Sequence, residues 1–136
     1  FKHDYVLVTN SDLLTNIDYE KFFLEFIRNE ADMMVLSIPY QVSIPYAVLE
    51  TSHGIVKSFK EKPTYTYLSN GGIYLVKKEL LQFIPKNEFY NATDLVDILI
   101  ENNYKVASYS FSGYWLDIGK KEDFEKAQLD INTIKF

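Results

Sequence analysis

Two aspartates follow strand-like segments and could bind a divalent cation. Asp12 comes soon after residues 5–9, a run rich in apolar and β-branched residues, and Asp117 lies near the end of Gly113–Ile118. Ligands of open α/β sheets bind at the carboxyl ends of strands, and Mg²⁺ takes one or two carboxylates together with substrate phosphates. The two aspartates could therefore share one Mg²⁺. Each also has a simpler interpretation, because Asp12 could form an Asx turn and Asp117 stands close to Gly119.

A lysine and an amide are further polar groups in suggestive settings. Pro63 favours extended backbone at Lys62, and a lysine held in one direction can bind phosphate as a point charge. Asn70 precedes Gly71 and Gly72, where the lack of side chains permits close approach by a ligand. Both segments have plainer interpretations, namely a solvated charged loop around Lys62 and a turn at the two glycines.

The composition narrows the possible functions and partners. The chain has 136 residues, of which 47% are hydrophobic and 24% charged, so it can form a core of one domain. Its net charge of −5 argues against nucleic acid or an anionic membrane surface as a partner. The absence of Cys excludes disulfides and thiolate chemistry and suits the cytoplasm. No apolar run approaches the roughly 18 residues of a membrane span.

Strand and helix signals alternate along the chain and predict an α/β fold. Residues 5–9 read as a strand buried on both faces, and with a helix and a second strand they form a unit typical of parallel pairing. Two short runs joined by Ser52-His53-Gly54 predict an antiparallel hairpin. The strands are expected at residues 5–9, 33–38, 46–50, 55–59, 73–76, 105–111 and 113–118. The helices are expected at residues 18–29, 92–102 and 122–131, with a short turn at 80–84.

Five short motifs follow one another along nearly the whole chain. They are Val6–Asp12, Pro45–Val48, Phe59–Pro63, Asn70–Tyr74 and Gly113–Gly119. Together they resemble the sugar-phosphate nucleotidyltransferases, which include glucose-1-phosphate thymidylyltransferases and mannose-1-phosphate guanylyltransferases. The resemblance implies a Rossmann-like fold with a mixed sheet, flanking helices and an antiparallel hairpin. It also implies a Mg²⁺-dependent reaction in which a sugar 1-phosphate attacks a nucleoside triphosphate and releases pyrophosphate.

The same resemblance implies roles for individual residues. Asp12 and Asp117 would hold the metal, and Lys62 would bind the sugar phosphate, which makes these three the catalytic residues. Glu61 would accept hydrogen bonds from sugar hydroxyls. The other residues of the sugar pocket would be Tyr46, Ala47, Asn70, Gly71 and Gly72.

Three departures from the family pattern affect what is expected of this chain. Ser11 and Ala47 stand where the family commonly has glycine. The Gly-rich segment that grips the triphosphate should precede Phe1, and no substitute for it follows. We therefore expect residues 1–136 to be a single partial domain, the sugar-binding half, which is inactive alone. The strand at residues 5–9 should then have a free edge, which predicts self-association.

Two other classes of protein remain possible. In a nucleotide-sugar glycosyltransferase a metal-binding Asp also follows a buried strand, but Asn10-Ser11-Asp12 lacks the second carboxylate of an Asp-x-Asp pair. A noncatalytic module that senses sugar phosphates or mediates assembly is the second alternative. It would bind a sugar 1-phosphate without turnover.

Overall fold

The computed structural model describes residues 3–136. They divide into two units. The first, called here the core unit, comprises the chain up to Ile38 and from Asn70 onward. The second, called the hairpin unit, is Pro39–Ser69. No helix in the described part of the chain is long and apolar enough to cross a bilayer.

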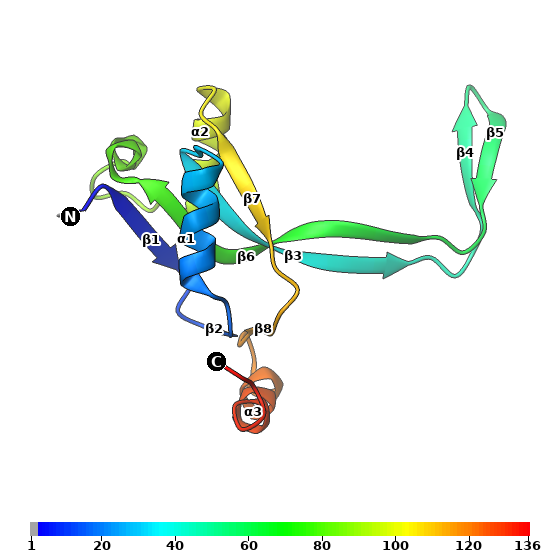
Figure 1. Ribbon diagram of the computed structural model, residues 1–136. Coiled ribbons are helices and arrows are strands. Elements are labelled where there is room, and N and C mark those ends of the chain that lie inside the picture. The colour runs from blue at the N-terminus through cyan, green and yellow to red at the C-terminus, as the bar shows by residue number, and fades with distance from the viewer. Residues whose placement is uncertain (1–2) are drawn as a thin grey trace. The chain divides into compact units, whose positions relative to one another are not determined.

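A four-stranded mixed sheet forms the centre of the core unit (Figure 1). Its strands are, in spatial order, β1 (Tyr5–Thr9), β6 (Thr64–Lys77), β3 (Met33–Ser43) and β7 (Val106–Ser110). β1 runs antiparallel to β6, whereas β3 and β7 are parallel. The predicted mixed α/β fold is confirmed.

The neighbour of β1 differs from the expectation. β6 lies between β1 and β3, so the two ends of the predicted strand-helix-strand unit do not pair. The expectation that residues 5–9 are buried on both faces is also wrong, because Val6 is the only buried residue of β1. The physical reason is position, since β1 is an edge strand of the described sheet and edge strands keep one side open.

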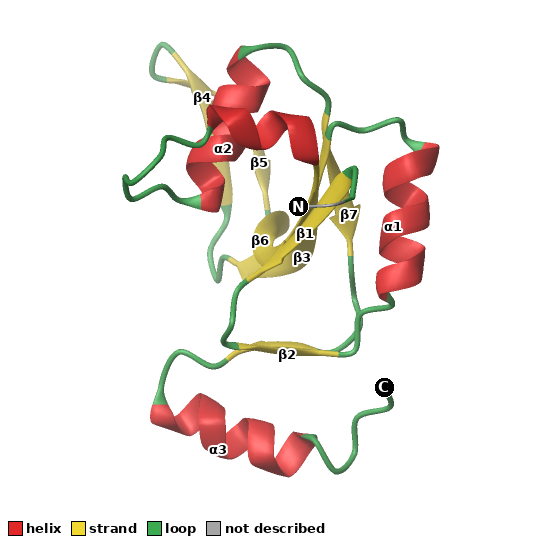
Figure 2. Ribbon diagram, turned by 90° about the vertical axis from the view of Figure 1, so that its left-hand side faces the viewer, coloured by secondary structure: helices red, strands yellow, loops and turns green. Residues whose placement is uncertain are grey.

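Two helices cover opposite faces of this sheet, as Figure 2 shows. α1 (Tyr19–Arg28) places Phe22 and Phe26 in one apolar cluster. α2 (Ala92–Glu101) places Leu95 and Leu99 in a second cluster, which also contains Leu80 of the short 3-10 helix η1 (Lys78–Phe83). Successive residues of a strand point to opposite faces, so the sheet supplies both clusters, for example Met34 to the first and Met33 to the second.

Local side-chain contacts explain why the helices begin where the sequence predicts. The carboxylate of Asp18 accepts a hydrogen bond from the Lys21 amide at 3.1 Å, which satisfies a free N–H of the first turn of α1. At α2, the Asp94 carboxylate accepts from the Asn91 amide at 2.8 Å, half of a capping box. Both predicted starts are confirmed to within one residue.

A second, smaller strand pair carries the last helix. β2 (Leu13–Thr15) pairs antiparallel with β8 (Trp115–Asp117), and α3 (Lys121–Asp130) follows β8. β2 is too short to show a periodic pattern and was not expected. Within α3, Ala127 is buried, whereas Phe124 and Ile131 are about half exposed, at 53% and 52%.

The hairpin unit contains the predicted antiparallel hairpin, β4 (Val48–Ser52) and β5 (Ile55–Lys60). The turn between them places His53 and Gly54 at positive φ, 49° and 76°, as a tight hairpin turn requires. No residue from Pro39 to Ser69 is buried. This unit is therefore held by backbone pairing rather than by a core of its own.

Candidate functional site

β2 and β8 bring the two predicted metal ligands to adjoining strand ends. Their antiparallel register places Leu13 opposite Asp117. The Ile118 amide donates to the Asp12 carbonyl oxygen at 2.8 Å, so Asp12 and Asp117 leave the same end of the strand pair. Both aspartates are exposed. Among residues 3–136, neither carboxylate takes part in a hydrogen bond or an ion pair.

The chemistry of this pair fits Mg²⁺. Two exposed carboxylates without protein partners offer oxygen ligands to a hard cation. The described part of the chain contains no group of three or more His, Cys, Asp or Glu that could hold a metal. A cation here would therefore take its other ligands from water and substrate phosphates, the arrangement that Mg²⁺ favours.

Gly71 and Gly72 lie inside β6 and not in a turn, which corrects the plainer interpretation of these residues. Gly72 has a φ of 73°, and a β-carbon there would come within 2.5 Å of the Asn10 side-chain nitrogen. A β-carbon on Gly71 would come within 2.9 Å of Leu36. Packing against Leu36 therefore requires glycine at position 71, and the positive φ favours glycine at position 72.

The carbonyl oxygens of these two glycines accept hydrogen bonds from two different segments of the chain. The Asn10 amide donates to the Gly72 carbonyl at 2.8 Å, and the Trp115 indole N–H donates to the Gly71 carbonyl, also at 2.8 Å. Asn10 lies two residues before Asp12, as Trp115 lies two residues before the other aspartate. The glycine pair thus connects the two aspartate-bearing segments, an arrangement called here the three-segment junction.

Sequence reasoning missed Asn10 and Trp115. Trp115 is the only tryptophan in the chain and lies within the Gly113–Gly119 motif, which was the available signal. Asn10 likewise lies within the Val6–Asp12 motif, but its contact partner is more than sixty positions away and its role depends on the strand register.

The Asn70 side chain is already held on both of its polar atoms. Its carbonyl oxygen accepts from the Gly72 amide at 2.9 Å, and its NH₂ group donates to the Tyr74 hydroxyl at 2.6 Å. A side-chain amide offers two donors and two lone pairs. One donor and one lone pair therefore remain for a ligand, and the two internal bonds fix where they point.

The remaining predicted site residues lie in the hairpin unit. These are Tyr46, Ala47, Glu61 and Lys62, all exposed. Lys62 has a φ of 42°, so the expectation of extended backbone before Pro63 is wrong. Lys62 belongs to the tight connection between β5 and β6, where Ile44 donates to the Pro63 carbonyl at 3.0 Å. The structure thus joins Asp12, Asn70, Gly71, Gly72 and Asp117 within the core unit.

A half-buried tyrosine, Tyr114, holds α3 beside the junction. The Tyr114 hydroxyl donates to the Asp130 carboxylate at 2.5 Å, and the Lys126 ammonium donates to the same oxygen at 2.6 Å. Burial, and secondly the bond to Asp130, raise the pKa of Tyr114 to about 12. Hydrogen bonds from Lys126 and then from Tyr114 lower the pKa of Asp130. The cluster therefore holds the helix next to β8.

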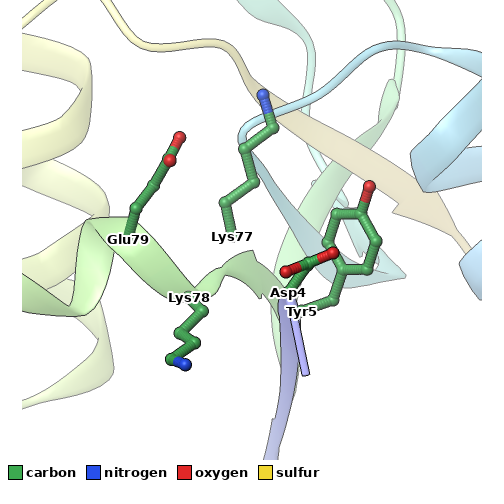
Figure 3. A pocket seen from close by; sticks show the side chains of 5 residues that line it. All are labelled: Asp4, Tyr5, Lys77, Lys78 and Glu79. Carbon is green, nitrogen blue, oxygen red and sulfur yellow. The ribbon is translucent and has the colours of Figure 1, made fainter. Parts of the chain in front are cut away.

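A separate hollow of about 450 Å³ lies at the other end of β1 (Figure 3). It is lined by Asp4, Tyr5, Lys77, Lys78 and Glu79. Lys77 is already paired with Asp32 at 2.8 Å, and this hydrogen bond lowers the pKa of Asp32. Two carboxylates and two lysines line the hollow, so it favours neither anions nor cations. We therefore do not propose it as a substrate site.

Comparison with known proteins gives a consistent result. A family model described as nucleotidyl transferase matches residues 1–134. Glucose-1-phosphate adenylyltransferase from Bacillus thuringiensis (strain Al Hakam) is 29% identical over 143 residues, which is 96% of this chain and 38% of the relative. The same enzyme from Bacillus mycoides (strain KBAB4) matches equally, at 29%. The chain therefore spans less than half the length of these curated relatives.

Two solved structures share the fold. HddC from Yersinia pseudotuberculosis has a TM-score of 0.65 at 24% identity, covering 96% of this chain and 56% of HddC. A putative glucose-1-phosphate thymidylyltransferase from Bacillus anthracis, solved with sucrose, has a TM-score of 0.66 at 20% identity, covering 99% and 57%. At these identities the structural likeness establishes the architecture alone.

Proposed function

Because the chain belongs to the nucleotidyl transferase family, we propose that the protein couples a sugar 1-phosphate to a nucleoside triphosphate. An oxygen of the sugar phosphate attacks the α-phosphorus, the bond from that phosphorus to the bridging oxygen breaks, and pyrophosphate leaves. The products are a nucleotide sugar and pyrophosphate. The observation that carries the proposal is the three-segment junction, which gathers two free carboxylates beside a glycine pair.

Within this proposal, Asp12 and Asp117 hold Mg²⁺, which when bound neutralises phosphate charge. The Gly71 and Gly72 backbone lines the sugar pocket, and Asn70 offers its remaining donor and lone pair to a hydroxyl. Three hydrogen bonds join the segments that carry these residues: Asn10 to Gly72, Trp115 to Gly71, and Ile118 to Asp12. They hold the segments in place before substrate arrives, and such positioning lowers the barrier to phosphoryl transfer.

We also propose roles for four residues of the hairpin unit. Lys62 binds the sugar phosphate, Glu61 accepts hydrogen bonds from the sugar, and Tyr46 and Ala47 line its pocket. The backbone of Lys62 supports a functional role, because its φ of 42° would suit glycine or asparagine better. Lysine at a left-handed position stores local strain, and such strain clusters at functional sites.

We further propose that residues 1–136 are one partial domain, the sugar-binding half of the enzyme, and that the enzyme works in the cytoplasm. The 38% coverage of the adenylyltransferase relatives and the single arginine of the chain support the first point. The lack of Cys supports the second. Alone, this half should release no pyrophosphate and should self-associate through β1.

The test is pyrophosphate release by the full-length protein with a panel of sugar 1-phosphates, triphosphates and Mg²⁺. Asp117→Asn should lose at least about a hundredfold in rate, since charge neutralisation at the phosphates depends on the metal. Asp97→Asn, which removes an exposed carboxylate on α2, is the matched control and should keep wild-type activity. If the folded wild-type protein binds a sugar 1-phosphate without turnover, the transferase proposal is wrong and a sugar-phosphate sensor is the better interpretation.

A further inference from the structure

The strand that carries Asp117 belongs to a very short ladder. β8 pairs with β2 over three residues, with Leu13 opposite Asp117 and Thr15 opposite Trp115. A slip of one residue in a strand pair turns every side chain to the other face. Such a slip would turn the Asp117 carboxylate away from its present direction. The register of this pair therefore decides where Asp117 points.

Asn16 binds the residue that leads into β8. Asn16 and Tyr114 stand opposite each other, one position beyond the last paired residues, and the Asn16 amide donates to the Tyr114 carbonyl at 3.2 Å. In a hydrogen-bonded antiparallel pair the two residues exchange both N–H···O bonds. Here the return bond goes to the side chain, because the Tyr114 amide donates to Asn16 Oδ1 at 2.8 Å. The side chain of Asn16 thus takes the place of a ladder carbonyl at the end of the strand pair.

The other bonds of Tyr114 do not replace this one. The Thr15 hydroxyl donates to the Tyr114 carbonyl at 2.7 Å, and that carbonyl also accepts from the Asn16 amide. The Tyr114 hydroxyl binds Asp130 of α3, so it does not relate β8 to β2. Within residues 3–136 the Tyr114 N–H has Asn16 Oδ1 as its acceptor. Removing that oxygen leaves a half-buried N–H without its partner, which is costly.

A glycine beside Tyr114 makes the contact with Asn16 specific for one register. A β-carbon on Gly113 would come within 2.9 Å of Asn16 Oδ1, closer than real β-carbons approach other atoms. A slip of one residue would bring Ser112 or Tyr114 to this position, and each of them carries a β-carbon. The slipped registers are therefore blocked at Asn16, whereas the observed register is hydrogen-bonded there.

We propose that Asn16 is a positioning residue for the metal site, because its side-chain oxygen fixes the register of β8 and with it the direction of Asp117. The inference rests on the proposed function, in which Asp12 and Asp117 hold Mg²⁺. At the other end of the pair the Ile118 amide donates to the Asp12 carbonyl at 2.8 Å, so β8 is fastened at both ends. Asn16 follows the end of β2 that is remote from Asp12, so it acts through the strand and not as a metal ligand.

Metal binding by the full-length protein tests this role. Mn²⁺ serves as a paramagnetic substitute for Mg²⁺, and electron paramagnetic resonance measures its free concentration. Asn16→Ala removes the oxygen, and the Mn²⁺ dissociation constant should rise about fivefold, the effect of losing one intramolecular hydrogen bond. Asn16→Asp keeps an oxygen for the Tyr114 N–H but loses the donor that binds the Lys135 carbonyl. It should stay within about twofold of wild type.

Two further variants complete the set. Asn16→Gln keeps an amide but moves its oxygen outward by one methylene, so it should weaken Mn²⁺ binding as Asn16→Ala does and replaces that variant if alanine prevents folding. Asn132→Ala is the matched control, because it removes an exposed amide that donates to the Gln128 carbonyl and has no bond to β8. It should bind Mn²⁺ like wild type. Circular dichroism and the fluorescence of Trp115 establish that each variant is folded.

A rate measurement separates positioning from a general loss of structure. For Asn16→Ala, the Mg²⁺ concentration that gives half the maximal rate of pyrophosphate release should rise about fivefold, whereas the rate at saturating Mg²⁺ should stay within about twofold of wild type. A partly unfolded variant would lose rate at every Mg²⁺ concentration. Hydrogen exchange gives a readout without metal, because amides of residues 114–118 should exchange about fivefold faster in Asn16→Ala while those of residues 73–76 stay unchanged.

The possible results separate this inference from the proposed function. A folded wild-type protein that neither binds Mn²⁺ nor depends on Mg²⁺ overturns the metal site and this inference together. Equal Mn²⁺ affinity in wild type and in folded Asn16→Ala or Asn16→Gln overturns the positioning role and leaves the proposed function intact. Equal weakening in Asn16→Asp and Asn16→Ala also overturns it, because the bond to the Lys135 carbonyl would then be responsible.

Discussion

At the scale of single residues, Gly72 has the least tolerance for change. An alanine there would adopt a φ of 73° and bring its β-carbon within 2.5 Å of the Asn10 side chain. The left-handed backbone costs about 1–2 kcal/mol, and overpacking adds about 1–3 kcal/mol. Gly72→Ala should therefore lower the free energy of unfolding by about 2–5 kcal/mol, measured by urea titration.

Gly119→Ala is the control for this substitution. No atom lies within 4 Å of a β-carbon at Gly119, and its φ is not positive. Its midpoint in urea should match that of the wild type. Equal losses in the two variants would contradict the claim that the contact with Asn10 makes Gly72 necessary.

A second prediction at this scale concerns alkaline pH. Tyr114 has a pKa of about 12 in the folded chain and 10.0 as its ordinary value, so the folded state binds its proton more tightly. The stability that this tyrosine contributes is complete below pH 10 and is lost as pH rises through about 12. Tyr114→Phe should be less stable than wild type near neutral pH, because it lacks the bond to Asp130, yet lose less stability above pH 10.

The measurement is urea unfolding at a series of alkaline pH values, followed by the fluorescence of Trp115, which neighbours Tyr114. The difference between the two proteins should shrink as pH rises. A constant difference across the series would contradict the contribution assigned to the Tyr114 proton.

At the scale of elements, α1 depends on Asp18, the residue that caps its start. The Asp18 carboxylate accepts from the Lys21 amide at 3.1 Å, and the helix that it begins carries the fully buried Phe22 and Phe26. Asp18→Ala should destabilise the chain by about 1 kcal/mol, whereas Asp18→Asn, an equally good cap, should be nearly neutral. Urea midpoints of the two variants decide this, and a loss of similar size in both would assign the effect to the charge of Asp18 instead of its hydrogen bond.

Strand β6 is longer than the apolar run from which a strand was predicted. β6 runs over Thr64–Lys77, although only residues 73–76 have the continuous apolar character from which a strand was predicted. Those four residues are buried between the two helices, whereas the first part of the strand contains no buried residue. Backbone pairing extends β6 beyond the part that burial stabilises.

At the scale of the whole molecule, stability should differ between the two units. The hairpin unit has no buried residue, and regions with few buried apolar contacts open at low free energy. Backbone amides of residues 39–69 should therefore exchange with deuterium faster than those of residues 73–76, even though β6 contributes to both sets. Hydrogen exchange of overlapping peptides measures this. Equal protection along β6 would show that the hairpin unit is stabilised by something other than burial.

Local chemistry determined much of this protein from the sequence alone. The starts of α1 and α2 follow from capping residues next to them, and the β4–β5 hairpin follows from Ser52-His53-Gly54, which suits a tight turn. Each of these features depends on residues a few positions apart, within the reach of propensity and capping rules. The five ordered motifs likewise indicated the family that the family model identifies.

Only the tertiary structure decided which distant segments meet. β6 separates β1 from β3, Gly71 and Gly72 lie inside a strand, and Asp12 adjoins Asp117 because of a register between β2 and β8. The bonds to the two glycine carbonyls join positions 44 and 62 residues apart. Apolar periodicity fixes which face of a strand is buried, but it does not specify its neighbour. Pairing and register depend on how all the strands and helices share one core, and that is a property of the whole chain.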